Sequence, residues 1–509
     1  MGYNELSYLL LFLPAALIVY QVTPARYRKF VLLAFSWLYF FLCSRLLIFY
    51  LLGTTVGVYL LAIAMDRVQE AASRKKLLCA AGVAGLFGVL LYVKYTNFFI
   101  RVLNQLGAGN SGWQEIPAVK ILVPIGISYY TLEAVGYLLE VYWGRQKAER
   151  SFVRVALFLS FFPQTMEGPI ARWQDTAMQL TEGHGLTSEN LRDGSVRILW
   201  GLFKKMLIAD RLNTAVNALF TNYTQYQGAM TAVSGIFYAL QLYMEFSGVV
   251  DIILGSAQMF GIRLPENFRQ PFFSQTASEF WRRWHITLGV WCKTYLFYPV
   301  TTSRLTMRWN RFARKKCGKY VARIGVTAIA LTPVWLFNGL WHGPQWNYIF
   351  YGIYYLVLLW LEEVLVPVKK AFYEKTGFSS SHTFWHLFRI LRTWIIIFTG
   401  EMFFRAAGLR AGLEMFRRLF QGVHLSAIRE GGLLQLGLDR MDYRVIVLGT
   451  AAVFVYDLMK ERKVPVWETI VQKRKAVSWT LVYCLIFAIV LFGAYGPGYQ
   501  KVDLIYAGF

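Results

Sequence analysis

The chain has 509 residues, of which 56% are hydrophobic and 16% are charged, and its mean hydropathy is +0.40. This composition excludes a soluble globular enzyme and indicates a protein that crosses a lipid bilayer several times, because one crossing takes about 20 apolar residues. The net charge of +24 lies mainly between the apolar runs. It therefore indicates membrane topology and anionic lipid headgroups rather than nucleic acid.

The first apolar run has no basic region before it and no small-residue cleavage site after it, so we expect a retained helix rather than a removed signal. The expected membrane spans are residues 8–23, 30–45, 47–65, 77–94, 121–142, 195–220, 231–256, 321–341, 346–366, 386–405, 444–459 and 477–496. Basic clusters between spans are expected to face the cytoplasm, at residues 26–29, 67–76, 145–150, 304–323, 369–375 and 460–475. This topology places the N-terminus and residues 105–117 outside.

Two stretches do not fit a simple series of crossings. Residues 152–175 contain an apolar piece too short to span, and residues 271–300 contain a second one that ends at Pro299. Basic loops lie on both sides of each stretch, so we expect re-entrant or interfacial segments. The predicted fold is therefore an all-α polytopic membrane protein with eleven or twelve transmembrane helices, and these two segments, around a central tunnel. We expect one domain over residues 1–509.

His342 lies inside the longest charge-free run, the 38 residues from Ile324 to Leu361. An imidazole at membrane depth indicates function, because polar groups are costly to keep there. Pro344 predicts that a helix ends at about His342, and Asn338 shares the helix face of His342 one turn earlier. Gly339 and Gly343 would leave room beside them for a substrate.

Burial favours a neutral ring at His342, which is suited to act as a general base on a hydroxyl during acyl transfer. The amide of Asn338 could then donate to the developing oxyanion. The alternative for His342 is a core histidine hydrogen-bonded between helices.

His285 belongs to a second aromatic-rich segment. The apolar side chains of this segment recur at helical spacing, at Phe280, Trp284, Leu288 and Trp291. Arg282 falls on another face, where it and Arg283 would meet phosphates. The segment is either an interfacial anchor or the cytoplasmic mouth through which an anionic acyl donor enters past His285.

Five acidic residues interrupt the expected spans, and the five cysteines are scattered. We expect each acid to face the interior and to pair with Arg, Lys or a backbone donor, a structural rather than a catalytic role: these are Glu133, Glu140, Glu245, Asp251 and Glu401. No pair of cysteines has metal-ligand or redox spacing, and no Gly-rich phosphate loop or HExxH motif is visible, so the sequence predicts no metal site and no bound cofactor.

Together, five short motifs resemble the membrane-bound O-acyltransferase (MBOAT) family. They are VPIGISYYT at 123–131, SFFPQ at 160–164, GPIAR at 168–172, FWRRWHITL at 280–288 and NGLWHG at 338–343, in the family's order. The likeness is good over residues 1–366 and looser over 367–509. It is similar to the alginate-type branch and, in much of the pattern, to the teichoic-acid D-alanyl branch. The long C-terminal part favours the alginate type.

The resemblance implies a cup of helices around a tunnel in a bacterial cytoplasmic membrane. It implies that His342 is the catalytic histidine and that His285 is the second family histidine of the catalytic site, on the cytoplasmic side. The residues expected to line the tunnel are Asn338, Trp341, Arg282, Trp281 and Glu167. Glu167 departs from the small residue that relatives usually carry, which leaves acceptor selectivity open.

The resemblance also implies the substrates and partners. Acetyl-CoA or another acyl thioester is the expected cytoplasmic donor, and the acetyl group would pass outward to a cell-surface polysaccharide with an extracytoplasmic acetyltransferase partner. One alternative is D-alanyl transfer from an acidic acyl-carrier protein, which a basic cytoplasmic surface would suit. An alternative of another class is a transporter or flippase for a lipid-linked glycan.

Overall fold

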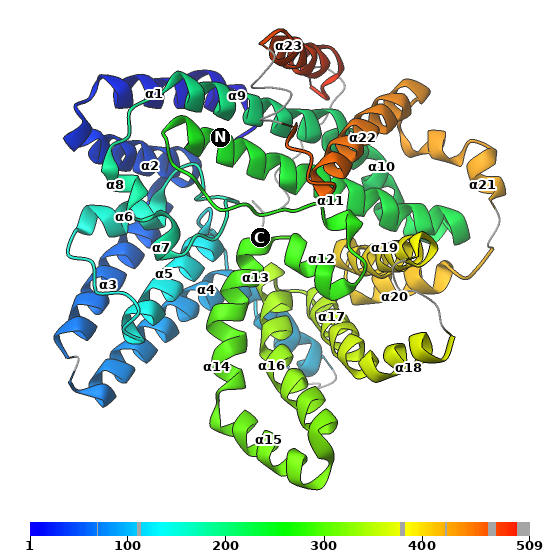
Figure 1. The fold of residues 1–509 in the computed structure, drawn as a ribbon, viewed down its shortest axis with the longest axis horizontal. Helices are drawn as coiled ribbons and strands as arrows, with labels where there is room; N and C mark the ends of the chain where they lie inside the picture. Colours follow the sequence, from blue (N-terminus) through cyan, green and yellow to red (C-terminus); the bar gives the residue numbers. More distant parts are fainter. Residues whose placement is uncertain (69, 109–112, 377–381, 423–424, 467–474, 496–509) are drawn as a thin grey trace. The chain divides into compact units, whose positions relative to one another are not determined.

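The structure is a computed structural model that describes residues 1–68, 70–108, 113–376, 382–422, 425–466 and 475–495. This described part is helical and contains no strand, which confirms the predicted all-α class (Figure 1). Contacts divide the chain into two compact units. Unit 1 comprises residues 1–198 and 249–265, and unit 2 comprises residues 199–248 and the described residues from 266 onward.

Unit 1 contains the N-terminal helices and the first of the two broken stretches. Its elements are η1 (Ser7–Phe12), α1 (Leu13–Val22), η2 (Ala25–Tyr27), α2 (Arg28–Ser44), η3 (Arg45–Leu47), α3 (Ile48–Arg67), α4 (Ala72–Gly107), α5 (Ile127–Tyr142), α6 (Phe152–Ser160), α7 (Trp173–Thr176) and α8 (Gln179–Glu182). Two longer helices, α9 (Ser188–Leu202) and α11 (Gly228–Met259), contribute residues to both units.

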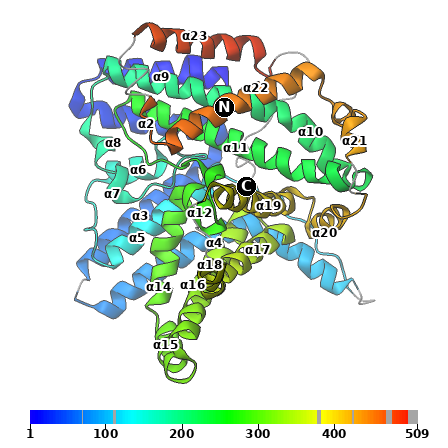
Figure 2. The ribbon, with the colours of Figure 1, turned by 45° about the vertical axis from the view of Figure 1, so that its right-hand side comes forward.

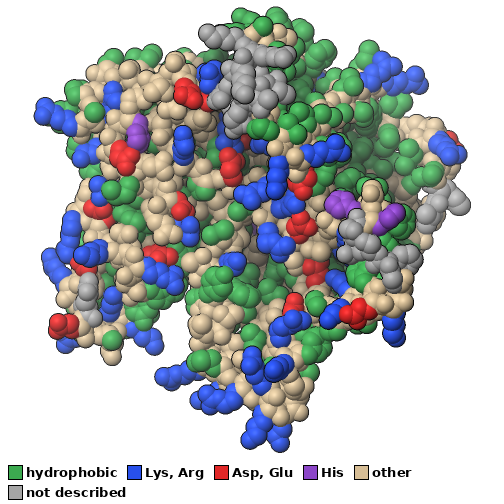
Figure 3. All heavy atoms as spheres, viewed as in Figure 1, with side chains coloured by type: hydrophobic (Ala, Val, Ile, Leu, Met, Phe, Trp, Pro, Cys, Tyr) green, Lys and Arg blue, Asp and Glu red, His purple; other side chains and the backbone are tan. Residues whose placement is uncertain are grey.

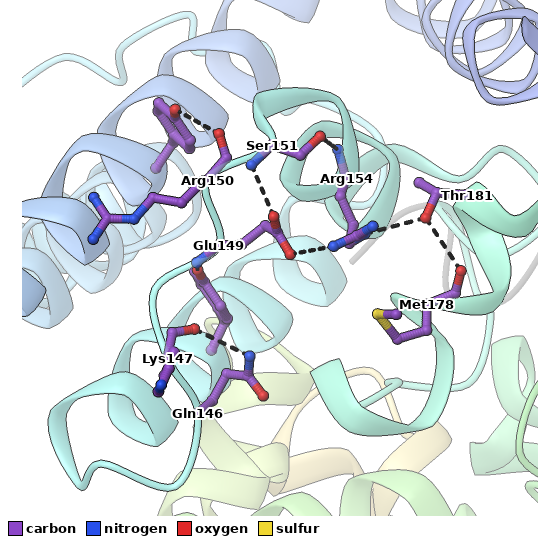
Figure 4. A network of polar contacts seen from close by, with 10 residues as sticks. Gln146, Lys147, Glu149, Arg150, Ser151, Arg154, Met178 and Thr181 are labelled. Atoms are coloured by element: carbon purple, nitrogen blue, oxygen red, sulfur yellow. Dashed lines mark hydrogen bonds and ion pairs between the residues drawn. The ribbon is translucent and has the colours of Figure 1, made fainter. Parts of the chain in front are cut away.

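A polar network in unit 1 fixes the start of α6 (Figure 4). The Glu149 carboxylate accepts hydrogen bonds from the backbone N–H of Ser151 at 2.8 Å and from the guanidinium of Arg154 at 2.6 Å. Arg154 also donates to the hydroxyl of Thr181 at 3.1 Å, while the Ser151 hydroxyl caps the helix. The predicted basic loop at 145–150 is therefore tied to α6 by Glu149, and Arg154 of α6 continues the network to α8.

Unit 2 contains both candidate histidines. Its elements are η4 (Phe203–Ala209), α10 (Asp210–Thr221), η5 (Tyr223–Gln225), η6 (Pro271–Phe273), α12 (Ala277–Arg283), α13 (Ile286–Cys292), η7 (Lys293–Phe297), α14 (Tyr298–Thr301), α15 (Arg304–Lys316), α16 (Gly318–His342), α17 (Trp346–Val364), α18 (Val366–Thr376), α19 (Thr383–Arg405), α20 (Leu409–Arg418), α21 (Ser426–Arg429), η8 (Gly432–Leu436), α22 (Arg440–Glu461) and α23 (Lys475–Phe492). In both ribbon views, α16 and α17 lie side by side (Figures 1 and 2).

Long apolar helices are present in the described residues, which supports the membrane class. Four helical runs are long and apolar enough to cross a bilayer, at residues 25–67, 72–107, 228–259 and 318–342, and α17 with α18 forms a fifth candidate that is bent by 46°. Eleven or twelve crossings were expected. Fewer helical runs meet this length test than the number of expected spans, because residues 25–67 hold two of the expected spans in one run and because other apolar runs are divided. Residues 195–220, for example, fold as α9, the π-helix η4 and α10, with Lys204 and Lys205 buried in the π-helix.

The two stretches that did not fit simple crossings are short helices in the structure. Residues 152–175 form the nine-residue α6, a turn and the four-residue α7. Residues 271–300 form five short elements, of which α12 and α13 have seven residues each. The prediction that neither stretch makes one spanning helix is confirmed, because about 20 residues are needed to cross. Their depth in the bilayer stays a prediction.

A strongly basic surface of unit 2 lies on α15, at the bottom of the view in Figure 3. All six of its cationic side chains are exposed: Arg304, Arg308, Arg311, Arg314, Lys315 and Lys316. Leu305 and Phe312 are also exposed on this helix. An amphipathic helix with this composition is typical of a membrane surface that carries anionic headgroups.

Candidate active site

His342 is the last residue of α16, as the proline two residues later predicted. Its side chain is buried, with 5% of its surface exposed. The end of α16 packs closely on α17, because a Cβ on Gly339 would lie 2.5 Å from the carbonyl oxygen of Tyr348 and a Cβ on Gly352 would lie 2.3 Å from that of Trp335. The space at Gly339 is therefore filled by α17 and not left for a substrate, contrary to our expectation.

Aromatic rings from three helices surround the His342 imidazole. Phe404 of α19 meets it edge to face with ring centroids 4.9 Å apart. Tyr351 and Tyr348 of α17 lie 6.0 and 6.4 Å away, and the adjacent Trp341 lies 5.1 Å away. Such rings hold the imidazole by packing.

A polar link joins α17 and α19 beside this ring cluster. The hydroxyl of Tyr351 donates to Oε1 of Glu401 at 3.0 Å, and both side chains are buried. Oε2 of Glu401 meets no partner in the described residues. The prediction that Glu401 pairs with Arg, Lys or a backbone donor is wrong, because the nearest donor that α17 presents to it is a phenol.

The other four acids have the partners that we predicted. Glu133 accepts from the backbone N–H of Ala171 at 3.2 Å. The remaining three are ion-paired: Glu140 with Arg145 at 3.8 Å, Glu245 with Lys205 at 3.2 Å, and Asp251 with Arg197 at 3.0 Å.

His285 occupies a turn between α12 and α13. Its φ is 43°, in the left-handed region, which costs about 1–2 kcal/mol for a residue with a Cβ. The apolar stripe predicted for one continuous segment is thus divided between two helices, although all four of its side chains are buried. Glu362 of α17 holds the first turn of α12, accepting from the N–H of Ala277 at 2.8 Å and from the hydroxyl of Ser278 at 2.6 Å.

Asn267 fixes the orientation of the His285 ring. Its Oδ1 lies 3.2 Å from Nδ1 of His285 and accepts from the backbone N–H and the hydroxyl of Thr287 at 3.1 and 2.9 Å. Phe246 packs edge to face on the imidazole at 4.9 Å. Burial lowers the pKa of His285 to about 3, so the ring is neutral at physiological pH.

Trp341 connects the two histidines. Its indole centroid lies 5.8 Å from that of His285 and 5.1 Å from that of His342. The two imidazoles thus flank one aromatic side chain, although 57 positions separate them in the sequence. The motifs FWRRWHITL and NGLWHG meet at this indole.

Three of the other predicted lining residues also lie in unit 2. Asn338 is buried one turn before His342, and its Oδ1 meets no partner in the described residues. Trp281 packs between α16 and α17, with ring centroids 5.1 Å from Trp335 and 4.8 Å from Tyr355. Arg282 is exposed.

Arg283, which we expected to meet phosphates, is bound by two carboxylates. Its guanidinium binds Glu461 at 2.6 and 3.0 Å and Glu279 at 2.6 Å. These carboxylates raise the pKa of Arg283, although burial opposes them. Of the two arginines, only Arg282 presents an exposed cation that could meet an anionic donor.

Glu167 lies in unit 1, in the turn after α6. It is buried, with 1% of its surface exposed, and the hydroxyl of Tyr3 accepts from the backbone N–H of the preceding Met166 at 3.2 Å. Because Glu167 and the histidines belong to different units, its place in the tunnel lining stays a prediction. The structure shows no group of three or more His, Cys, Asp or Glu residues able to hold a metal among those it describes.

Sequence reasoning missed two residues of this site. Asn267 precedes the recognised motif by many positions, and the Asn-Phe pair that it begins is too short to stand out. Tyr351 is one of many tyrosines in an apolar helix. The sequence signal for Tyr351 is its three-residue spacing from Tyr348, which places both on one helix face.

Comparison with known proteins shows the family of this chain. The MBOAT, membrane-bound O-acyltransferase family, matches residues 145–407, which include both histidines. A probable alginate O-acetylase of Pseudomonas aeruginosa is 30% identical over 88% of this chain and 81% of its own length. A peptidoglycan O-acetyltransferase of Helicobacter pylori is 28% identical over 82% of this chain and 79% of its own length.

A third relative matches a smaller part. A teichoic acid D-alanyltransferase of Bacillus subtilis is 30% identical over 48% of this chain and 60% of its own length. The matches, the sequence motifs and the long apolar helices all indicate a membrane-bound acyltransferase. The chain belongs to the membrane-bound O-acyltransferase family and is an integral membrane O-acyltransferase.

Proposed function

We propose that the protein O-acetylates a cell-surface polysaccharide from a cytoplasmic acetyl thioester, acetyl-CoA in the simplest case, with His342 as the general base. The observation that carries this proposal is a buried imidazole at a helix end, in ring contact with Trp341, whose indole also contacts a second buried imidazole. The membership of a transferase family sets aside the transporter alternative. We place the protein in the bacterial cytoplasmic membrane.

The proposed reaction uses one base and one oxyanion donor. The acceptor hydroxyl attacks the thioester carbonyl while His342 takes its proton. The amide of Asn338, on the same helix face, donates to the oxyanion. When the C–S bond breaks, the thiolate takes the proton from the imidazolium and an O-acetyl ester is left. The exposed Arg282 would attract the phosphates of the donor at the cytoplasmic side.

The names of the relatives support acetyl transfer over D-alanyl transfer. The relatives named for O-acetylation match more than four fifths of this chain, whereas the D-alanyltransferase matches about half. The acceptor would then be an alginate-like exopolysaccharide or peptidoglycan, and an extracytoplasmic acetyltransferase would be the expected partner protein.

Acyl transfer from a carrier protein keeps one observation in its favour. The exposed cations of α15 would suit an acidic carrier. Binding of labelled acetyl-CoA and of an acidic carrier protein to the purified protein would separate the two donors.

The test is acetyl transfer by purified protein in lipid nanodiscs, with labelled acetyl-CoA and oligosaccharide acceptors. We expect His342→Ala to lower turnover about 10²–10⁴-fold, the usual contribution of a general base. His386→Ala, which removes an exposed imidazole, is the matched control and should leave turnover unchanged. Full turnover by a folded His342→Ala protein would refute the role of His342.

A further inference from the structure

The contact between Asn267 and His285 defines the protonation of the imidazole. Asn267 is fully buried. Its Oδ1 must be the oxygen of the amide, because the backbone N–H of Thr287 points at it and can only donate. An amide oxygen only accepts, so Nδ1 of His285, which lies 3.2 Å away, carries the proton. In a neutral ring the lone pair then sits on Nε2.

Nε2 of His285 is thus a buried acceptor. It meets no hydrogen-bond partner in the described residues, although 97% of the residue's surface is covered, since only 3% is exposed. The ring cannot turn to find one without losing the Asn267 bond and its packing against Phe246 and Trp341. A buried unpaired acceptor is costly, and the left-handed backbone at His285 adds strain. Both costs are typical of functional sites.

We propose that Asn267 is a positioning residue that holds His285 in the Nδ1–H form, so that Nε2 accepts a hydrogen bond from an N–H or O–H group of a substrate. This inference rests on the proposed function only for the identity of that substrate. Two sources share the chemistry: an amide N–H of the arm that carries the thioester, and the hydroxyl of the acyl acceptor.

The first test reads the tautomer directly and needs no turnover. Nitrogen NMR of the purified protein with ¹⁵N-labelled histidine, compared with His285→Gln to assign the signals, should show His285 protonated at Nδ1 and unprotonated at Nε2. Asn267→Ala should allow protonation at Nε2. A wild-type His285 protonated at Nε2 would overturn the proposal, whether or not the protein transfers acetyl groups.

The second test asks which ring nitrogen of His285 contributes to turnover. The terminal amide of Gln reaches the position of Nε2, whereas the amide of Asn reaches only that of Nδ1. We expect His285→Gln to keep at least about tenfold more kcat/KM than His285→Asn, the value of about one hydrogen bond. Asn tolerates the left-handed backbone better than Gln, so a stability effect would act in the opposite direction. Higher activity of His285→Asn would show that the residue only anchors the turn.

The KM that rises in the His285→Asn variant distinguishes the two sources of the donor group. If the amide of the donor binds Nε2, His285→Asn should raise the KM for acetyl-CoA both in transfer and in slow hydrolysis without acceptor. If the hydroxyl binds, the KM for the acceptor should rise and hydrolysis should stay unchanged. An unchanged KM in both assays would contradict substrate binding at Nε2. Failure of the proposed function would appear separately, as wild-type protein that turns over no acetyl-CoA.

Discussion

The two histidines of this site are held in opposite ways. His342 ends the regular 25-residue helix α16 and is enclosed by rings from three helices. His285 has a left-handed backbone between two seven-residue helices and is oriented by the amide of Asn267. The comparison shows that one side chain can be made rigid by packing or by hydrogen bonding. Packing leaves the orientation of its nitrogens less defined, whereas the bond to Asn267 also fixes the tautomer.

The largest effect is expected where the packing of His342 is disturbed. Gly339→Ala puts a methyl group 2.5 Å from the Tyr348 carbonyl oxygen, so α16 and α17 must separate at a cost of about 3 kcal/mol. Gly85→Ala, in α4 with nothing within 4 Å of the added methyl, is the control and should be neutral or stabilising. Thermal unfolding in detergent measures both. Equal melting temperatures would show that close packing does not hold His342.

The polar link beside His342 should matter somewhat less. Tyr351→Phe removes the hydroxyl that donates to Glu401 and leaves a buried carboxyl group without that donor, which costs about 2 kcal/mol. We expect lower stability and lower turnover, and the double variant Tyr351→Phe with Glu401→Leu should recover part of the stability. No recovery in this double-mutant cycle would mean that the two side chains act independently.

The different backbone conformations at positions 285 and 342 predict that replacing Ala by Gly has opposite effects on stability at the two positions. At position 285, with φ of 43°, Gly should be more stable than Ala by about 1 kcal/mol, because Gly adopts left-handed geometry without strain. At position 342, in α16, Ala should be more stable than Gly by up to about 1 kcal/mol, because of helix propensity. Denaturant unfolding of the four variants measures this. If Gly and Ala ranked in the same order of stability at both positions, the difference in backbone conformation would be contradicted.

The smallest effect is a dependence of stability on pH. Burial lowers the pKa of His285 from 6.5 to about 3, so the folded protein disfavours the proton that the unfolded chain binds. The contribution of the neutral ring is full above about pH 6.5 and is lost as pH falls from 6.5 towards 3. Between pH 7.5 and pH 6 the loss should stay below about 1 kcal/mol. His285→Gln should flatten this part of the stability curve, and an unchanged slope would speak against a buried neutral imidazole.

The features that could be predicted from the sequence depend on neighbours along the chain. The helix end at His342 follows from Pro344 two residues later, and the two broken stretches follow from short apolar pieces between basic loops. The turn at His285 could not be predicted, because Asn267, 18 positions earlier, and Glu362 on α17 impose it. A helical repeat of apolar residues passes through the turn unchanged and gives no sign of the break.

Two further misses have the same origin. We expected a charged or backbone partner for Glu401, but the contact of α19 with α17 supplies the hydroxyl of Tyr351. We expected open space at Gly339, but the backbone of α17 fills it. In both cases the sequence shows that a position is unusual. Only the packing of distant helices shows what the position contacts.

The contacts of Trp341 have a kinetic consequence. Because its indole touches both imidazoles, a small rotation of the last turn of α16 would change the surroundings of His285 and His342 together. Binding of a substrate at one imidazole would then affect the other imidazole through the Trp341 side chain, with no rearrangement of the fold. Turnover would therefore respond to the pair as a unit, and the emission of Trp341 would report the occupancy of either ring.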